Sequence, residues 1–242
     1  MTGLFLHNKI LKKEILFFTT FFILLTIIGT LTHELGHITF AKFTGYKNTK
    51  LHYDSMYCNN LPLQEEIIKI YKKNKYFIDN NLDFLNKEEY LKKGQQLKLK
   101  NLLVTIGGPL QTISTGILGL LILYLRRHKN KLKFNLIDWI GVFLSLFWLR
   151  EIFNLTVSIS SKLFFNGKNY FGGDELYISR RLHISDGSVP ISLGLIGLLI
   201  SFYVVFKIVP EKYRFSFIIS GIIGGIIGYF IWFHFLGLLV LP

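Results

Sequence analysis

The chain of 242 residues contains only one cysteine, Cys58. A single cysteine excludes an intrachain disulfide and a thiolate zinc cluster, so any metal site must use histidine and carboxylate side chains. Charged residues are also scarce, at 18% of the chain against the quarter or so that is usual in soluble domains. Half of the residues are hydrophobic, and 23 are phenylalanine. This composition is typical of a membrane protein.

Acidic residues are the rarer charged class, with 15 Asp and Glu against 28 Lys and Arg, and the net charge is +13. A charge of this size could attract nucleic acid, but the sequence contains no nucleic-acid-binding motif. The Lys and Arg residues largely flank apolar runs, where they favour the cytoplasmic side and anionic lipid headgroups. We therefore expect the lipid bilayer, and no nucleic acid, to be the partner of the basic residues.

No linker rich in Pro, Gly or Ser and no internal repeat divides the chain, which favours one polytopic membrane domain over residues 1–242 and argues against a transporter. Five apolar segments are each near the ~20 residues that cross ~30 Å of hydrocarbon, and lipid requires them to be helical. Glycines inside the segments are predicted to pack helices within the bundle. The expected spans are about residues 15–40, 102–125, 136–159, 189–209 and 215–241. The predicted fold is therefore an all-α bundle of about five transmembrane helices.

The first span follows a short basic N-terminus and mimics a signal peptide, but no small-x-small cleavage site follows it, so a retained helix is expected. A polar insert of about residues 46–100 separates the first and second spans. Weak alternation over residues 50–57 predicts a strand, and residues 63–75 and 85–99 predict helices at the surface of the protein. Basic residues in the N-terminus and the short loops place those segments in the cytoplasm and the insert outside.

The most informative motif ends the first apolar run and has the form His-Glu-x-x-His, with His33, Glu34 and His37 at its defined positions. Histidines four residues apart lie about one helical turn apart on the same face, so both imidazoles can reach one zinc ion. Zinc lowers the pKa of its bound water from 15.7 to about 7, and Glu34 is the predicted general base. Ionisable residues in a membrane segment are costly and usually functional. A zinc hydrolase is therefore favoured over simple capping of a helix at the membrane surface.

The sequence around this motif resembles the site-2 protease family. Residues 29–37 read Gly-Thr-Leu-Thr-His-Glu-Leu-Gly-His and residues 41–45 read Ala-Lys-Phe-Thr-Gly, like that family's first-motif helix. Residues 107–110, Gly-Gly-Pro-Leu, are similar to the family's Gly-Pro-Leu-x-Asn element, with Thr112 in place of the Asn. The resemblance implies a membrane-embedded zinc site that cleaves other membrane proteins within or next to their spanning segments. The family's Leu-Asp-Gly element and a PDZ-like insert are absent.

Catalytic zinc generally has three protein ligands and one open position, so a third ligand is needed. Asp174 is the best candidate, because it follows the third span, where the family places its aspartate. Gly172 and Gly173 would allow the backbone to approach the site closely. Glu175 is the adjacent alternative ligand, and an ordinary Gly-Gly-Asp turn is the structural alternative.

Three further residues are predicted to bind substrate: Gly108 and Pro109 at the second span, and Asn154 in the third, for which packing is equally plausible. His234, in the fifth segment, is predicted to form a hydrogen bond inside the bundle rather than to bind metal. Five alternating spans would bring all these residues to one leaflet. The loop charges place that leaflet outside, whereas the family places its site towards the cytoplasm, and both orientations stay open.

These observations lead us to expect an integral, multi-pass protein of a bacterial cell membrane. Its expected activity is zinc-dependent hydrolysis of peptide bonds in membrane-protein or peptide substrates, with Zn²⁺ as cofactor. The strand over residues 51–57 is expected to pair with an unwound substrate by β-addition. The alternative is a catalytically degenerate membrane protein whose zinc site acts in binding or regulation, because the Leu-Asp-Gly element is missing.

Overall fold

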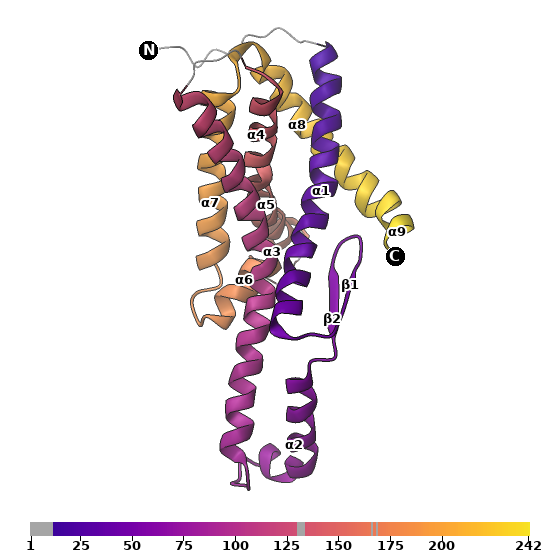
Figure 1. Ribbon diagram of the computed structural model, residues 1–242, viewed down its shortest axis with the longest axis vertical. Coiled ribbons are helices and arrows are strands. Elements are labelled where there is room, and N and C mark those ends of the chain that lie inside the picture. The colour runs from indigo at the N-terminus through magenta and orange to yellow at the C-terminus, as the bar shows by residue number, and fades with distance from the viewer. Residues whose placement is uncertain (1–11, 130–133, 166, 168) are drawn as a thin grey trace.

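The protein is described by a computed structural model for residues 12–129, 134–165, 167 and 169–242. It is a bundle of helices with one small two-stranded sheet (Figure 1), which confirms the all-α prediction with a small polar insert. Lys9, Lys131 and Lys133, which contributed to the orientation prediction, lie outside the described residues.

Four helices among the described residues are long and apolar enough to cross a membrane. They are α1 (Lys12–Thr44), α3 (Lys87–Lys129), α7 (Ser188–Tyr203) with its continuation η2 (Val204–Ile208), and α8 (Glu211–Ile231) with η3 (Trp232–Leu236) and α9 (Gly237–Val240). They agree with the first, second, fourth and fifth predicted spans and fit a membrane protein. The total of five spans stays a prediction.

The third predicted span is helical but interrupted. Its parts are α4 (Leu136–Ser145), the 3₁₀ turn η1 (Leu146–Trp148) and α5 (Leu149–Phe164). The start of α4 is fixed by a capping box, in which the Asn135 side chain accepts from backbone N–H groups and Asp138 accepts from the Asn135 N–H. All three residues of η1 are buried. The interruption places two charged residues, Arg150 and Glu151, at the beginning of α5.

The polar insert differs from its prediction in two respects. The predicted strand is a hairpin of β1 (Asn48–Leu51) and β2 (Met56–Asn59), which pair antiparallel with Leu51 opposite Met56. The helix predicted over residues 85–99 is the first part of α3, whose 43 residues run about 64 Å into the bundle. No proline interrupts this stretch before Pro109, so the helix continues without a break. With α2 (Pro62–Asp79), this part of α3 forms an arm beyond the bundle (Figure 1).

Packing among the membrane helices uses aromatic side chains and glycine. Phe18 and Phe22 of α1, Phe143 of α4 and Phe217 of α8 meet in one buried cluster. Gly224 and Gly228 of α8 lie against the backbone of α1, where a Cβ would overlap it at Gly224 and be tightly packed against it at Gly228. The prediction that small residues pack helices within the bundle is therefore confirmed for this pair.

The hairpin is attached to the C-terminal end of the chain. The Tyr53 N–H donates to the Leu241 carbonyl at 3.0 Å, and the indole of Trp232 donates to the Tyr53 carbonyl at 2.7 Å. These bonds fix the turn between β1 and β2 on η3 and α9, at the same end of α1 as the His-Glu motif (Figure 1).

Candidate metal centre

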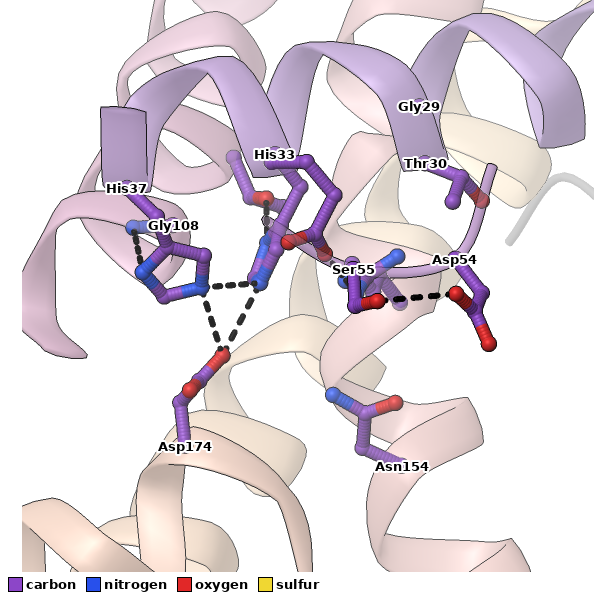
Figure 2. Close-up of polar contacts among 12 residues, drawn as sticks. Gly29, Thr30, His33, His37, Asp54, Ser55, Gly108, Asn154 and Asp174 are labelled. Carbon is purple, nitrogen blue, oxygen red and sulfur yellow. Dashed lines mark hydrogen bonds and ion pairs between the residues drawn. The ribbon is translucent and has the colours of Figure 1, made fainter. Parts of the chain in front are cut away.

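The two histidines of the motif point to a common space from consecutive turns of α1. His33 and His37 are buried, with exposed fractions of 1% and 6%. Their Nε2 atoms are 3.2 Å apart. Figure 2 shows both rings facing Asp174, which approaches from a different helix. The two imidazoles therefore lie on the same face of the helix, as the spacing of four residues predicted.

Asp174 reaches this space from the first turn of α6 (Gly173–Arg181). Its Oδ2 atom lies 3.0 Å from the Nε2 atom of each histidine. Gly173, the residue before it, has φ +70°, in the left-handed region that favours glycine, and this conformation turns the chain into the helix. Glu175, the alternative ligand, is turned away and accepts a hydrogen bond from the Asn154 amide at 3.1 Å.

The three atoms lie slightly closer together than the ligand atoms of a bound zinc ion. Zinc–ligand bonds of about 2.0–2.1 Å place the ligand atoms of a tetrahedral site about 3.3–3.4 Å apart. The observed separations of 3.0–3.2 Å are a few tenths of an ångström shorter. His33, His37 and Asp174 thus form a group that can hold a metal ion.

Outer partners orient both imidazoles. The Nδ1 atom of His37 lies 2.7 Å from the Val104 carbonyl, and the Nδ1 atom of His33 lies 2.9 Å from the Thr112 hydroxyl. A carbonyl oxygen only accepts, so His37 Nδ1 carries a proton and donates it. The Gly108 N–H also lies 3.3 Å from this Nδ1, but the shorter contact decides the tautomer. A neutral His37 therefore presents an unprotonated Nε2 to the site, as a metal ligand must.

The charge of the site points to a cation. Burial alone raises the pKa of Asp174, but His33 and His37 lower it by more, so its pKa lies below the usual range and the side chain is a carboxylate. The unprotonated Nε2 of His37 and the Asp174 carboxylate oxygen at 3.0 Å repel one another unless a proton or a cation lies between them. A metal ion would bind these two atoms and the Nε2 of His33 at once.

Glycine makes room for the site between α1 and α3. Gly36 and Gly107 face each other, and a Cβ on either would overlap the carbonyl oxygen of the other. The two helix backbones therefore touch beside the motif. Gly108 is placed more critically, because a Cβ there would overlap the Nε2 atoms of both His33 and His37. The absence of a side chain at Gly108 leaves open the space that a bound ion would occupy.

The glutamate of the motif is buried beside the ligands, with an exposed fraction of 6%. The Arg150 guanidinium of α5 lies 4.0 Å from the Glu34 carboxylate. This positive charge favours the ionised form of Glu34, which is the form that accepts a proton. Arg150 of α5 thus pairs with a residue of another helix inside the bundle. Glu151, the next residue, is buried as well.

Not every predicted site residue joins the group. Gly108 lies against it and Pro109 follows in the same helix, whereas Asn154 contacts Glu175. His234 is exposed on η3 and lies against the rings of Tyr229 and Phe230, without a hydrogen bond among the described residues. The predicted bundle hydrogen bond of His234 was therefore wrong, because the C-terminal helix turns this ring outward. The substrate-binding roles stay predictions.

Sequence reasoning missed the outer partners of the histidines. Val104, Gly108 and Thr112 are spaced by four residues and so occupy one face of α3, which faces the motif. That spacing was visible in the sequence once Gly108 had been singled out. Thr112 was noted only as a departure from Asn, yet its side chain is 1% exposed and holds His33.

Replacing Thr112 with Val should weaken metal binding while keeping the side-chain volume. Loss of an outer hydrogen bond to a metal-ligating histidine typically costs 10–100-fold in metal affinity. We expect a loss in this range, measured by competition of the purified protein with a zinc chelator dye. The matched control is Thr115→Val on the same helix, because Thr115 bonds only within α3. Equal zinc affinity in both variants would show that Thr112 does not orient His33.

The chain has no match among protein-family models, curated proteins or solved structures. Its function must therefore be argued from the geometry of this centre and from its place in the bundle.

Proposed function

We propose that the protein is a zinc metalloprotease that hydrolyses peptide bonds of membrane proteins within or next to the bilayer. The observation that carries the proposal is the convergence of His33, His37 and Asp174 on one point beside a buried glutamate. Two imidazoles and one carboxylate are a donor set that suits catalytic zinc, because they leave one coordination position open.

Each residue of the site has its own role in the proposed reaction. Bound zinc would supply a Lewis acid that polarises the scissile carbonyl and activates water. His33, His37 and Asp174 hold the ion, and Thr112 and the Val104 carbonyl hold the imidazoles in place. Glu34, next to the first ligand, accepts a proton from the attacking water and delivers it to the leaving amide nitrogen.

A membrane substrate is supported by the surroundings of the motif. The centre is built on α1, one of the four membrane-length helices, at the end of its apolar run. Leu24, Ile28 and Leu35 are each more than 40% exposed and give the helix an apolar outer surface up to the motif. A substrate helix arriving through lipid would meet this surface before the metal centre. Gly108, Pro109 and Asn154 are the proposed substrate contacts.

The hairpin is the proposed docking element for an unwound substrate. Among the described residues, β1 and β2 pair only with each other, so each strand has an edge without a strand partner. The bonds from Tyr53 to Leu241 and Trp232 hold the hairpin in position at this end of α1. An extended segment pairing with one edge would expose its peptide bonds to attack, because a helical segment keeps its carbonyls hydrogen-bonded.

Metal removal tests the proposal directly. Protein reconstituted in vesicles with a single-span membrane substrate should cleave it within the apolar or juxtamembrane region. We expect activity to disappear with a zinc chelator and to return when zinc is added. Cleavage that persists in the chelated protein, with zinc content measured below one-tenth of an equivalent, would contradict a zinc mechanism.

The alternative of a degenerate site acting in binding or regulation rested on the missing Leu-Asp-Gly element. The approach of Asp174 to 3.0 Å from both histidines favours the catalytic proposal, because a complete ligand set exists without that element.

A further inference from the structure

A further pocket lies between α3 and the C-terminal end of α6, whereas Asp174 is in the first turn of that helix. It has a volume of about 510 Å³ and is lined by Lys98, Leu99 and Asn101 of α3, and by Arg180, Arg181 and His183 at the end of α6. No part of the proposed peptidase mechanism uses it.

The pocket is strongly basic. Arg180 forms two hydrogen bonds with the Asp186 carboxylate, at 3.0 and 2.8 Å, and its charge is thereby balanced. Lys98 and Arg181 form no ion pair with any of the described residues. Two cations therefore face one cavity with no anion beside them. Both side chains are exposed, so water screens their mutual repulsion, but the positive potential between them attracts an anion.

The level of the pocket in the bundle identifies the kind of anion. On α3 the last lysines, Lys98 and Lys100, are followed directly by the apolar run from Leu102. After α6, α7 begins at Ser188 and continues as a membrane-length helix. Both walls of the pocket thus change from basic to apolar at the same level, which is where a bilayer has its headgroups.

Exposed apolar side chains lie next to the basic residues in the sequence of both walls. Leu99, Leu182 and Ile184 are exposed by 58%, 48% and 44%. Exposed leucine and isoleucine next to unpaired cations fit a ligand with an anionic head and a hydrocarbon body. A free phosphate ion would use the cations but gain nothing from these side chains.

We propose that this pocket binds the phosphate of an anionic phospholipid headgroup. The lipid phosphate lies between Lys98 and Arg181, and its glycerol and acyl chains lie along Leu99 and Leu182. The bound headgroup bridges α3 and α6, the helices that carry Gly108 and Asp174, and so holds the third metal ligand against the rest of the site. The inference does not depend on whether the protein is a peptidase.

Lipid binding to the full-length protein in neutral detergent tests the inference. Phosphatidylglycerol is titrated and bound lipid is counted by native mass spectrometry. Each basic residue near anionic lipid contributes about fivefold, so Lys98→Gln/Arg181→Gln should bind about 25-fold more weakly. Lys72→Gln/Lys75→Gln makes the same charge change on exposed residues of the arm and should bind as the unmodified protein does. Lys98→Arg should keep the affinity.

The lipid specificity is tested with two further probes. Phosphatidylcholine should bind at least tenfold more weakly than phosphatidylglycerol, and inorganic phosphate should not displace the lipid. The inference is overturned if Lys98→Gln/Arg181→Gln binds phosphatidylglycerol as tightly as the arm variant. Displacement by inorganic phosphate would instead assign the pocket to a free anion. Equal melting temperatures of the two double variants exclude loss of folding as the cause of weaker binding.

Discussion

Glu34→Gln is expected to abolish peptide cleavage while leaving zinc in the protein. The amide keeps the size of the side chain but does not accept a proton from water at neutral pH, so the general-base contribution of about 10²–10⁴-fold in rate is lost. His33, His37 and Asp174 are unchanged, and zinc content should stay at one equivalent. Single-turnover cleavage of the reconstituted membrane substrate and metal analysis of the same sample measure both quantities.

The matched control for this change is Glu14→Gln. Glu14 is in the first turn of α1, 20 residues from Glu34 and about 30 Å away along the helix. This variant undergoes the same chemical change in the same helix and should retain full activity. If Glu34→Gln cleaves as fast as Glu14→Gln, Glu34 is not the general base. If both variants bind zinc poorly, the defect lies in the folding of α1.

Gly108→Ala is expected to prevent zinc binding, although it adds only one methyl group. The new Cβ would overlap the Nε2 atoms of His33 and His37, which are the two atoms proposed to hold the ion. Relief requires separation of α1 from α3, and the contact of Gly36 with Gly107 opposes that movement. We expect at least a 100-fold loss in zinc affinity, measured by chelator competition, and a corresponding loss of cleavage.

Gly94→Ala is the control for Gly108→Ala, because Gly94 lies on the same helix and a Cβ there meets no atom within 4 Å. Alanine in a helix interior is more favourable than glycine by roughly 0.5–1 kcal/mol, so this variant should be slightly more stable and fully able to bind zinc. Normal zinc affinity in Gly108→Ala would show that the ion lies elsewhere or that the helices separate easily.

Much of the candidate site followed from local sequence rules. His33 and His37 share a face because four residues make about one helical turn, and this relation needs no tertiary information. The pairing with Asp174 needed more, since the two residues are 137 positions apart. Only the three-ligand rule and the resemblance to the site-2 protease family linked them. The distinction between Asp174 and Glu175 depended on the rotation of α6, which the contact between Glu175 and Asn154 fixes.

The fold was less predictable where propensity and packing compete. Apolar composition identifies residues 136–159 as a membrane segment, but the 3₁₀ turn η1 inside it depends on how Leu146, Phe147 and Trp148 pack against neighbouring helices. The continuity of α3 across the edge of the apolar region was also missed. Hydropathy divides that helix at about Leu102, whereas backbone hydrogen bonding does not change there.

Because α3 is continuous, the arm and the part of α3 beside the metal centre have a fixed rotation relative to each other. Val104, Gly108 and Thr112 face the motif only at one setting of α3 about its own axis, and each residue of an α-helix advances that setting by about 100°. One residue inserted into α3 before Val104 would therefore rotate the arm by about 100° relative to the metal centre. If the arm kept its place instead, Val104, Gly108 and Thr112 would rotate away from the metal centre. The length of α3 thus sets the rotation of the arm relative to the metal centre. Insertions or deletions in this helix keep that rotation only when they add or remove whole helical turns.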